Sequence, residues 1–391
     1  MGNFIISGIG PSGHGAGRLV KELINYANVS NPGIKVITFY SKKNTLFKFL
    51  KNTFFGHYLK LIYYKLIQKS NSARQIQSIK HSTVLLLHPQ TLGFENFKIL
   101  IENKNKIFLY VLDNSFFCMK SLNYANGHKA CFDCLGNINT SSIGKNGCKP
   151  SPVMYSLQDN TGFLKYLNGI KMEVYFLAQN YLQQNLLFKH FGDQIKSDVV
   201  GMYTSEFAEN KIYNEKDNLK FDFVYHGSLE LAKGIMYFIE LAKGMPDNSF
   251  FIPYDINLVK NKLNLKILPT NINFENQTWE SGLEDTIKHS KIVVCPSLWS
   301  APIEGAFLKS IMVNGCVAVV DTEFAYSNEF TSDQIVKLNS DLVLSLSLLN
   351  EVLQNKEIRN KLVFESQAWF LKYVNQKEMS QAKLFKSVFG N

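Results

Sequence analysis

The chain has 391 residues, more than one ordinary domain needs, and its length suits two domains of about 150–200 residues each. A hydrophobic content of 46% supplies a sizeable core and excludes a chain that is disordered throughout. The net charge of +10 and the pI of about 9.1 favour anionic partners such as nucleotide phosphates or anionic lipid.

The amino terminus is predicted to form a strand, Asn3–Ser7, followed by a glycine-rich loop and a helix. Glycine allows a tight turn and a close approach of the backbone to a ligand, and a helix amino terminus favours an anionic group. Gly13, His14 and Gly15 are therefore candidate ligand-loop residues. A plain strand-to-helix turn explains the same residues, since the loop completes neither a Walker motif nor a dinucleotide fingerprint.

Targeting and membrane-spanning segments are not predicted. The start of the chain lacks the basic region of a signal peptide. No apolar run approaches the roughly 20 residues of a spanning helix. We therefore expect a cytoplasmic protein.

The stretch between Lys42 and Lys80 is basic and aromatic, and no acidic residue occurs between Glu22 and Glu95. A cationic amphipathic segment of this kind can lie on anionic lipid. One interpretation is a peripheral contact with the inner face of the membrane, where a lipid-linked acceptor resides. A solvated Lys face over a packed aromatic core is the alternative. We expect no nucleic-acid partner, because no recognised binding module is present.

A buried strand is predicted over Thr83–Leu87, and His88 follows directly. The carboxyl end of a parallel strand is a usual place for a functional side chain. His88 is therefore a candidate catalytic acid or base, although an ordinary structural His is the alternative. A further strand is predicted over Ile107–Leu112.

A cysteine-rich segment at about 114–152 holds four of the six cysteines of the chain, Cys118, Cys131, Cys134 and Cys148. In a cytosolic protein such a group indicates a metal site more than disulfides. Four thiolates suit tetrahedral zinc, with an iron–sulfur cluster as the second choice. The segment predicts a structural metal that pins an excursion of the first domain. A reduced, metal-free loop is the alternative.

The first half closes with a strand over Val174–Ala178, a helix over Gln179–Phe191 and a strand over Val199–Tyr203. A polar, charged stretch follows, which is typical of a link between domains. We therefore predict a first domain over 1–205 and a linker over 206–220.

The second half opens with a strand over Phe221–Tyr225, followed by Gly227-Ser228, by Lys233 and by a helix. A Lys near a helix amino terminus suits a phosphate group, because its charge and the backbone amides act together. A surface Lys with no ligand is the alternative.

A second strand–helix–strand unit lies within Lys291–Val320. It has a strand over Ile292–Cys295, a polar loop, a helix over Ala306–Val313, and Gly315, which we expect at positive φ just past the helix. The strand Cys316–Val320 completes a right-handed crossover. Its loop follows a parallel strand, where open α/β sheets bind ligands. The loop carries Glu304 and Gly305.

These two units resemble the donor-sugar motifs of GT-B glycosyltransferases of the family 4 type, also called glycosyltransferase group 1. Pro296-Ser297, Gly315 and Lys233 match that pattern. Ser228 stands where the family has the Arg that joins Lys in holding the donor diphosphate. Ser310 stands where the family has the Glu that holds the ribose, and Glu304 is the only carboxylate in its loop.

The resemblance implies a fold and a domain plan. The fold would be α/β, with two Rossmann-like domains facing a cleft, and the glycine-rich first loop would face that cleft. The second domain would cover 221–373, and a helix in 374–391 would return to the first domain.

The resemblance also implies a function. The chain would transfer a sugar from a nucleotide-sugar donor to a glycan or lipid-linked acceptor, with retention of configuration and without a catalytic metal or cofactor, in surface polysaccharide or glycoconjugate synthesis. His88 and Glu304 would be catalytic. The donor would be held by Gly227, Ser228, Lys233, Ser297, Gly305, Ala306 and Ser310. The missing Arg and Glu favour an alternative, a non-catalytic GT-B-like protein that binds nucleotide sugars or glycans.

Overall fold

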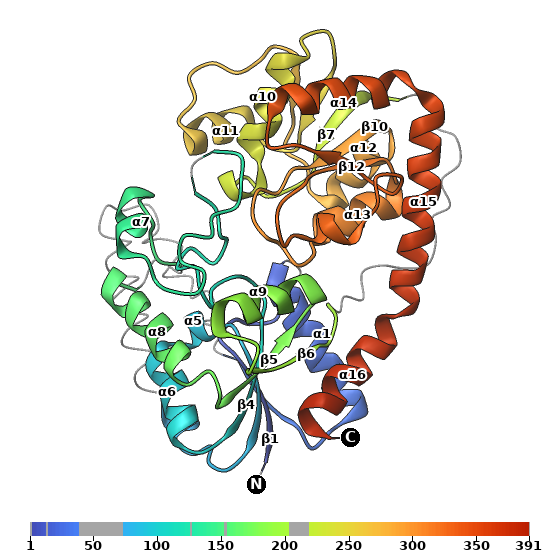
Figure 1. Cartoon of the computed structure of the whole chain (residues 1–391). Coiled ribbons are helices and arrows are strands. Elements are labelled where there is room, and N and C mark those ends of the chain that lie inside the picture. The colour runs from blue at the N-terminus through green and yellow to red at the C-terminus, as the bar shows by residue number, and fades with distance from the viewer. Residues whose placement is uncertain are drawn as a thin grey trace. The chain divides into compact units, whose positions relative to one another are not determined.

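The structure, a computed structural model, describes residues 2–12, 15–38, 73–125, 127–151, 155–202 and 219–390. The chain divides into two compact units (Figure 1). Unit 1 consists of Met1–Ser121, Asp133–Ser205 and Lys377–Asn391, and unit 2 consists of Leu122–Phe132 and Glu206–Gln376.

Unit 1 is built on a six-stranded sheet in the order β2-β1-β3-β4-β5-β6, with every neighbouring pair parallel. Its central strands are short apolar runs, as expected where helices cover both faces of a parallel sheet. The strand order reverses between β1 and β3. The strands are β1 (Asn3–Ser7), β2 (Lys35–Thr38), β3 (Thr83–Leu87), β4 (Lys106–Tyr110), β5 (Val174–Ala178) and β6 (Lys196–Val199).

Figure 1 shows α6 and α8 on one side of this sheet and α1 and α16 on the other. The last helix packs on the first, because Tyr26 of α1 and Phe385 of α16 have ring centroids 4.6 Å apart. Leu384 and Val388 join the same core. The helices are α1 (Gly15–Ser30), α4 (Ala73–Gln77), α5 (Pro89–Leu92), α6 (Phe94–Glu102), α7 (Thr140–Lys145), α8 (Leu157–Gly169), α9 (Tyr181–Phe191) and α16 (Lys377–Phe389).

Unit 2 is built on a second six-stranded parallel sheet, in the order β12-β11-β10-β7-β8-β9. The chain starts at β7, adds strands on one side, and then returns to add β10 on the other side. The point of reversal therefore lies between β7 and β10. The strands are β7 (Phe221–Tyr225), β8 (Phe250–Ile252), β9 (Ile272–Phe274), β10 (Ser290–Cys295), β11 (Val317–Val320) and β12 (Val336–Leu338).

The helices of unit 2 begin and end at identifiable residues. Gly234, with φ of 73°, precedes α10, and Gly315, with φ of 85°, follows α13 as expected from the sequence. Single-turn 3-10 helices cover Leu231–Lys233, Trp279–Ser281 and Tyr326–Glu329. The helices are α10 (Ile235–Gly244), α11 (Ile256–Leu263), α12 (Leu283–Lys288), α13 (Gly305–Val313), α14 (Leu342–Gln354) and α15 (Lys356–Asn375).

The segment Leu122–Phe132 corrects the predicted domain plan, which assigned the whole cysteine-rich insertion to the first domain. The segment belongs to unit 2 because its side chains find their partners there. His128 Nε2 lies 2.6 Å from Glu240 Oε2, and the ring of Phe132 meets the ring of Phe324 edge-on at 5.8 Å.

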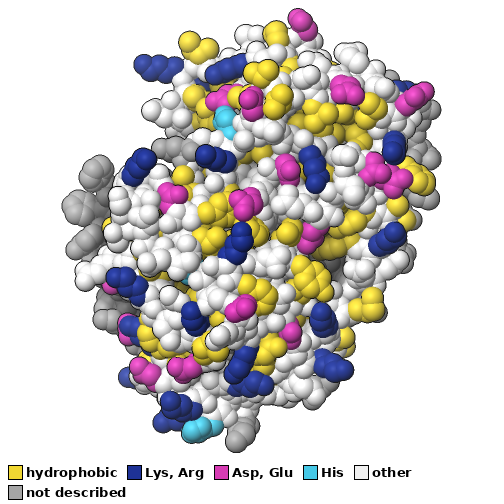
Figure 2. All heavy atoms as spheres, viewed as in Figure 1, with side chains coloured by type: hydrophobic (Ala, Val, Ile, Leu, Met, Phe, Trp, Pro, Cys, Tyr) yellow, Lys and Arg dark blue, Asp and Glu magenta, His cyan; other side chains and the backbone are white. Residues whose placement is uncertain are grey.

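Two predicted regions fall largely outside the described residues. The basic, aromatic stretch coincides mostly with 39–72, and the linker with 203–218. On the face drawn in Figure 2, Lys and Arg side chains are scattered among acidic and apolar ones. Among the described helices, none combines the length and apolar character needed to cross a membrane.

Candidate functional site

The strongest candidate site lies in unit 2, at the carboxyl ends of β7 and β10. Ligands of open parallel sheets bind where the strand order reverses, and these two strands flank that point. The turn after β7 approaches the end of β10 so closely that a Cβ on Gly234 would overlap the carbonyl oxygen of Pro296. Only glycine combines this approach with a positive φ.

Two tyrosines hold the loop that follows β7. The Tyr225 hydroxyl donates to the carbonyl oxygens of Ser228 and Lys233 at 2.7 and 3.1 Å. The Tyr254 hydroxyl donates to the carbonyl oxygen of Gly227 at 2.8 Å. The predicted residues Gly227 and Ser228 therefore lie in a loop of defined conformation, with the Ser228 side chain exposed.

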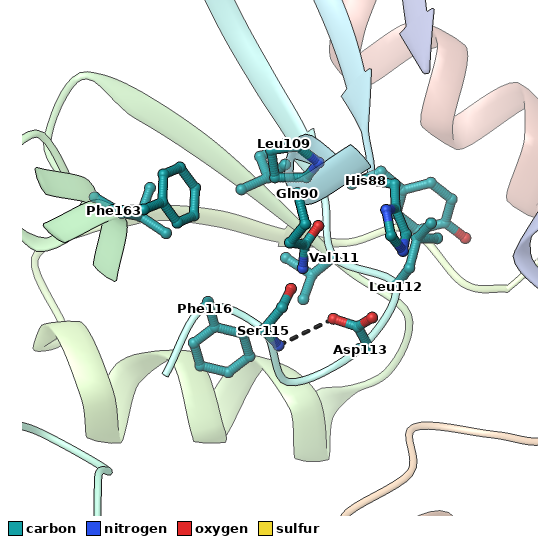
Figure 3. A pocket seen from close by; sticks show the side chains of 12 residues that line it. His88, Gln90, Leu109, Val111, Leu112, Asp113, Ser115, Phe116 and Phe163 are labelled. Carbon is teal, nitrogen blue, oxygen red and sulfur yellow. Dashed lines mark hydrogen bonds between the residues drawn. The ribbon is translucent and has the colours of Figure 1, made fainter. Parts of the chain in front are cut away.

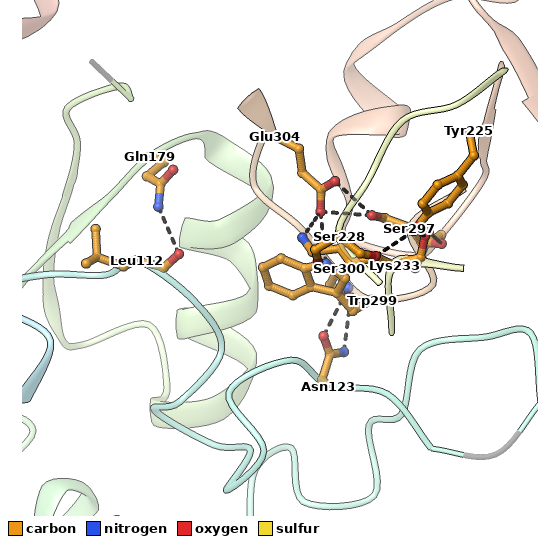
Figure 4. Close-up of polar contacts among 11 residues, drawn as sticks. Leu112, Asn123, Gln179, Tyr225, Ser228, Lys233, Ser297, Trp299, Ser300 and Glu304 are labelled. Carbon is orange, nitrogen blue, oxygen red and sulfur yellow. Dashed lines mark hydrogen bonds and ion pairs between the residues drawn. The ribbon is translucent and has the colours of Figure 1, made fainter. Parts of the chain in front are cut away.

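Lys233 and Glu304 form an ion pair at the centre of this site (Figure 4). Lys233 Nζ lies 2.5 Å from Glu304 Oε1, and it lies 4.8 Å from the centroid of the Trp299 ring. The Lys233 side chain is 19% exposed and that of Glu304 is 8% exposed. The pair joins the loop that follows β7 to the loop that follows β10, both within unit 2.

The carboxylate of Glu304 is enclosed by donors. The Ser297 hydroxyl lies 2.9 and 2.8 Å from its two oxygens, and Trp299 Nε1 donates to Oε1 at 3.0 Å. These donors, together with Lys233, occupy both oxygens of the carboxylate. Its geometry suits positioning Lys233, and the catalytic role that the resemblance implies for Glu304 stays a prediction.

Lys233 retains capacity for a ligand. An ammonium group has three N–H donors, and its described hydrogen bond to Glu304 uses one of them. Gly305 and Ala306 form the first turn of α13, where backbone N–H groups lack intrahelical partners. A cation and helix-end amides together suit an anionic group of the size of a phosphate.

His226 lies next to this loop and was not singled out from the sequence. Its Nδ1 lies 2.8 Å from Ser310 Oγ, and its ring stacks on Trp279 with centroids 5.7 Å apart. The Ser310 hydroxyl donates to the carbonyl oxygen of Ala306, so the neutral His226 ring carries its proton on Nδ1. Burial, and secondarily the charge of Lys309, lower the pKa of His226 to about 3.

Ser310 is fully buried, with 0% of its surface exposed. Its hydroxyl also lies 3.5 Å from Cys295 Sγ. The expected direct contact with a ribose needs an exposed hydroxyl, so the geometry does not favour that role. Ser310 supports His226 instead.

Asn123 is a second residue that the sequence motifs did not reveal. It is fully buried in unit 2 and pairs with Ser300: its Oδ1 accepts from the Ser300 backbone N–H at 3.0 Å and its Nδ2 donates to the Ser300 hydroxyl at 3.2 Å. The Ser300 hydroxyl donates in turn to the carbonyl oxygen of Glu323 at 2.6 Å. Asn123 thereby fixes the loop that carries Trp299 and Glu304.

The strand ends of unit 1 bring His88 against the glycine-rich loop. A Cβ on Gly8 would overlap the His88 carbonyl oxygen, so only glycine permits this contact. His88 has φ of 55°, an unusual value for a residue with a side chain, and its Nδ1 lies 2.8 Å from Thr91 Oγ1. Gly15, with φ of 52°, begins α1, whereas Gly13 and His14 lie outside the described residues.

Burial and charge act in opposite directions on His88. Burial lowers its pKa, and the nearby carboxylate of Asp113 raises it by a smaller amount. The imidazole is therefore neutral at neutral pH, a state in which it can accept a proton. His88 also lines a pocket in unit 1, together with Gln90, Asp113 and apolar side chains (Figure 3).

The predicted zinc site is not supported. Cys118, Cys134 and Cys148 belong to unit 1, whereas Cys131 belongs to unit 2. Within the described part of the chain, no group of three or more His, Cys, Asp or Glu side chains could hold a metal ion. Cys295 is a core residue of unit 2, with 1% exposure.

Comparison by sequence finds no relative: neither a protein-family profile nor a curated protein matches the chain. Comparison by structure finds similar proteins among the solved structures. A sucrose-phosphate synthase from Thermosynechococcus elongatus is 11% identical with a TM-score of 0.62, and each chain covers 100% of the other. Anabaena HepE, solved with UDP and glucose, is 10% identical with a TM-score of 0.59 over 98% of this chain and 99% of its own.

A third similar structure is WaaG, a glycosyltransferase involved in lipopolysaccharide biosynthesis. It is 12% identical with a TM-score of 0.57, over 99% of this chain and 100% of its own. At such low identity the likeness concerns the fold, and it extends over the whole chain. The chain therefore has the α/β fold of the GT-B glycosyltransferases, with one Rossmann-like sheet in each unit.

Proposed function

We propose that the chain is a glycosyltransferase that moves a sugar from a nucleotide-sugar donor to a glycan or lipid-linked acceptor. The observation that carries this proposal is the Lys233–Glu304 pair at the point where the strand order of unit 2 reverses. A largely buried Lys that is aligned by a carboxylate, beside two helix amino termini, suits the diphosphate of a nucleotide sugar.

The chemistry follows from where charge develops. When the bond between the sugar and the diphosphate breaks, negative charge grows on the leaving oxygen. Lys233 and the amides of Gly305 and Ala306 would stabilise that charge, with Glu304 and Ser297 holding the ammonium group in place. The exposed loop of Gly227 and Ser228 would add hydrogen bonds but no second cation.

On the acceptor side, we infer that His88 contacts the reacting sugar, because it lies at a strand end and is neutral. The resemblance to family 4 further leads us to infer that configuration is retained and that no metal or other cofactor takes part in catalysis.

HepE was solved with UDP and with UDP-glucose, so UDP-sugars are the first donors to test. The test begins with thermal shift against a panel of UDP- and GDP-sugars, followed by transfer assays with the donors that bind. We expect Lys233→Ala to lower kcat/KM by at least about tenfold, roughly 1.4 kcal/mol of transition-state stabilisation. Lys243→Ala, which removes an exposed Lys from the same unit, is the matched control and should leave turnover unchanged.

The variant set separates function from folding. Lys233→Arg keeps the charge and should retain part of the activity. Lys233→Met/Glu304→Gln removes both charges without leaving one of them unpaired, and it should remain folded but inactive. Wild-type turnover in Lys233→Ala would remove Lys233 from the site. Donor binding without any transfer or hydrolysis would instead favour the non-catalytic binding protein.

The proposal of a lipid-linked acceptor is based on the basic, aromatic stretch, most of which lies outside the described residues. Flotation with liposomes that contain anionic lipid tests this part. We expect salt-sensitive flotation, and a protein that stays at the bottom of the gradient at low salt would restrict the proposal to soluble acceptors.

A further inference from the structure

We propose that His226 selects the nucleotide of the donor, with its Nε2 accepting a hydrogen bond from the nucleoside that carries the diphosphate. The proposal deepens the glycosyltransferase function on which it rests, because it names a specificity-determining residue of the same site. The group that His226 recognises is a hydrogen-bond donor, either a ribose hydroxyl or an N–H of the base. His226 directly follows β7, and the next residue is Gly227 of the loop that we assign to the donor.

The hydrogen bonds of Ser310 fix the role of each ring nitrogen of His226. The Ser310 hydroxyl donates its one proton to the carbonyl oxygen of Ala306 at 2.8 Å, so it accepts from His226 Nδ1, also at 2.8 Å. In a neutral imidazole the other ring nitrogen then carries a lone pair. Burial keeps the ring neutral at neutral pH by lowering its pKa. Nε2 is therefore held in the form that accepts a hydrogen bond.

Nε2 is available to a ligand. It has no hydrogen-bond partner among the described residues, and it is not one of their unpaired side-chain atoms that solvent fails to reach. His226 is partly exposed, whereas Ser310 is fully buried. A ligand can therefore contact His226 although it cannot contact the hydroxyl that orients the ring.

The surroundings of His226 suit a nucleoside. The ring stacks on Trp279 at an interplanar angle of 15°, and Lys309 Nζ lies 4.6 Å from the centroid of the same indole. Trp279 is partly exposed, so its indole offers apolar surface to a sugar or a base. Ser310, the partner of His226, lies one helical turn, about 6 Å, beyond Ala306 along α13. The nucleoside is the part of the donor that follows the diphosphate, so we expect it next to His226.

An acceptor at this position would give the site a selectivity that Lys233 cannot supply. Lys233 donates hydrogen bonds and recognises negative charge, which every nucleoside diphosphate carries. A site that hydrogen-bonds a hydroxyl or an N–H of its substrate rejects an analogue that lacks this group, because the acceptor is then left unpaired. His226 would therefore distinguish ligands that Lys233 binds alike.

Isothermal titration calorimetry tests the proposal without an acceptor and without turnover. The probes are UDP and GDP, each with its 2′-deoxy and 3′-deoxy counterparts and with a counterpart methylated at the imino nitrogen of the base. We expect the wild type to bind one of these counterparts at least about tenfold more weakly than the parent nucleotide. A deoxy counterpart would identify a ribose hydroxyl as the group that His226 recognises, and the methylated one would identify the base.

The variants assign that discrimination to Nε2. His226→Phe keeps an aromatic ring beside Trp279 but removes the nitrogen, and it should reduce the discrimination to less than about twofold. His226→Gln keeps an acceptor and should restore part of it. His289→Phe is the matched control, because His289 precedes β10 at the opposite edge of the sheet and lies 3.0 Å from Asp285. It should discriminate as the wild type does.

The positioning role of Ser310 has its own readout. The nitrogen chemical shifts of the His226 ring should show a single tautomer in the wild type, with Nε2 unprotonated, and a mixture of both tautomers in Ser310→Ala. Binding of the parent nucleotide should move the Nε2 shift of the wild type as the hydrogen bond forms.

The outcomes separate this proposal from the function on which it rests. Equal binding of every counterpart and its parent, or discrimination that persists in His226→Phe, would mean that only water contacts Nε2. That result would overturn the role of His226 and leave the glycosyltransferase intact. Failure of both UDP and GDP to bind would refute both. Discrimination through His226 without any sugar transfer would refute the transferase and keep His226 as a nucleotide-selecting residue of a binding protein.

Discussion

Buried polar side chains at the strand ends are paired in unit 2, whereas one at the strand ends of unit 1 is unpaired among the described residues. In unit 2 the charges of Lys233 and Glu304 are paired with each other, and Ser297 and Trp299 complete the carboxylate's hydrogen bonds. In unit 1 the residue Gln90 is 2% exposed, and its neutral amide has no partner among the described residues. In the first arrangement the buried charges compensate each other, whereas in the second the hydrogen-bonding capacity of the amide is unused. The comparison predicts opposite responses to removing one polar side chain.

The largest effect is expected when the ion pair of unit 2 is broken. Lys233→Met leaves the buried Glu304 carboxylate without its counter-charge and should lower the free energy of unfolding by about 2–3 kcal/mol, somewhat less than a fully buried pair because Lys233 is partly exposed. Adding Glu304→Gln should restore most of the loss. Urea denaturation of the single and double variants measures both.

The control for this prediction is the exposed pair Lys220–Asp285, whose side chains are 51% and 54% exposed at an N–O distance of 2.7 Å. Lys220→Met should cost less than about 1 kcal/mol. Equal losses from Lys233→Met and Lys220→Met would contradict the claim that burial makes the first pair different.

The next effect has the opposite sign. Gln90→Leu replaces an unpaired buried amide by an apolar side chain of similar size, and it should raise the free energy of unfolding by about 1–2 kcal/mol. Gln183 is the control, because it is also 2% exposed and its Oε1 accepts from the Gln179 backbone N–H at 2.8 Å, so that only its Nε2 lacks a partner among the described residues. Gln183→Leu should therefore destabilise. If both variants lose stability in urea denaturation, Gln90 has a partner in solution and the contrast between the two strand ends fails.

The smallest effects concern two histidines that follow strands next to the points where the strand order reverses, His88 after β3 and His226 after β7. Burial lowers both pKa values, but Asp113 opposes it at His88 and Lys309 reinforces it at His226. Asp113→Asn should therefore lower the pKa of His88, and Lys309→Met should raise that of His226. Imidazole chemical shifts measured by NMR between pH 3 and pH 8 report both changes.

The lowered pKa of His226 also makes the free energy of unfolding depend on pH. The pKa of His226 is about 3 in the folded chain and about 6.5 in an unfolded one, so the unfolded state binds more protons between these values. Its contribution to stability is complete above about pH 6.5 and falls as the pH drops toward 3. His226→Gln should flatten that decline. An unchanged acid limb in the variant would show that His226 is not held neutral.

Much of the fold was predictable because parallel strands are short apolar runs between helices. The predicted bounds of β1, β3, β5 and β7 agree with the structure residue for residue. The prediction failed where that rule weakens. The last strand of the first half was predicted over Val199–Tyr203, because apolar residues lie there. In the structure β6 is Lys196–Val199, a more polar and partly exposed edge strand. In unit 2 the 3-10 helix Trp279–Ser281 and α12 are separated by Gly282, whose φ is 122°.

The candidate site was predictable only where its residues follow a motif. The resemblance to the donor-sugar motifs identified Lys233, Ser297 and Glu304, which the structure brings together. Asn123 could not be found in this way, because its partner Ser300 lies 177 residues further along the chain. Gln90 stands directly after the His88-Pro89 strand end, yet its significance is an unpaired amide, a property of three-dimensional packing.

The segment Leu122–Phe132 has a consequence for how the protein can be divided. The backbone passes between the units after Ser121, Phe132, Ser205 and Gln376. Severing the chain at the linker would therefore yield two incomplete fragments, one of them with Ser300 deprived of Asn123. During synthesis amino-terminal residues leave the ribosome first. Asn123 can therefore pair with Ser300 only after most of the second half has been synthesised. Each half thus needs residues encoded in the other to finish folding.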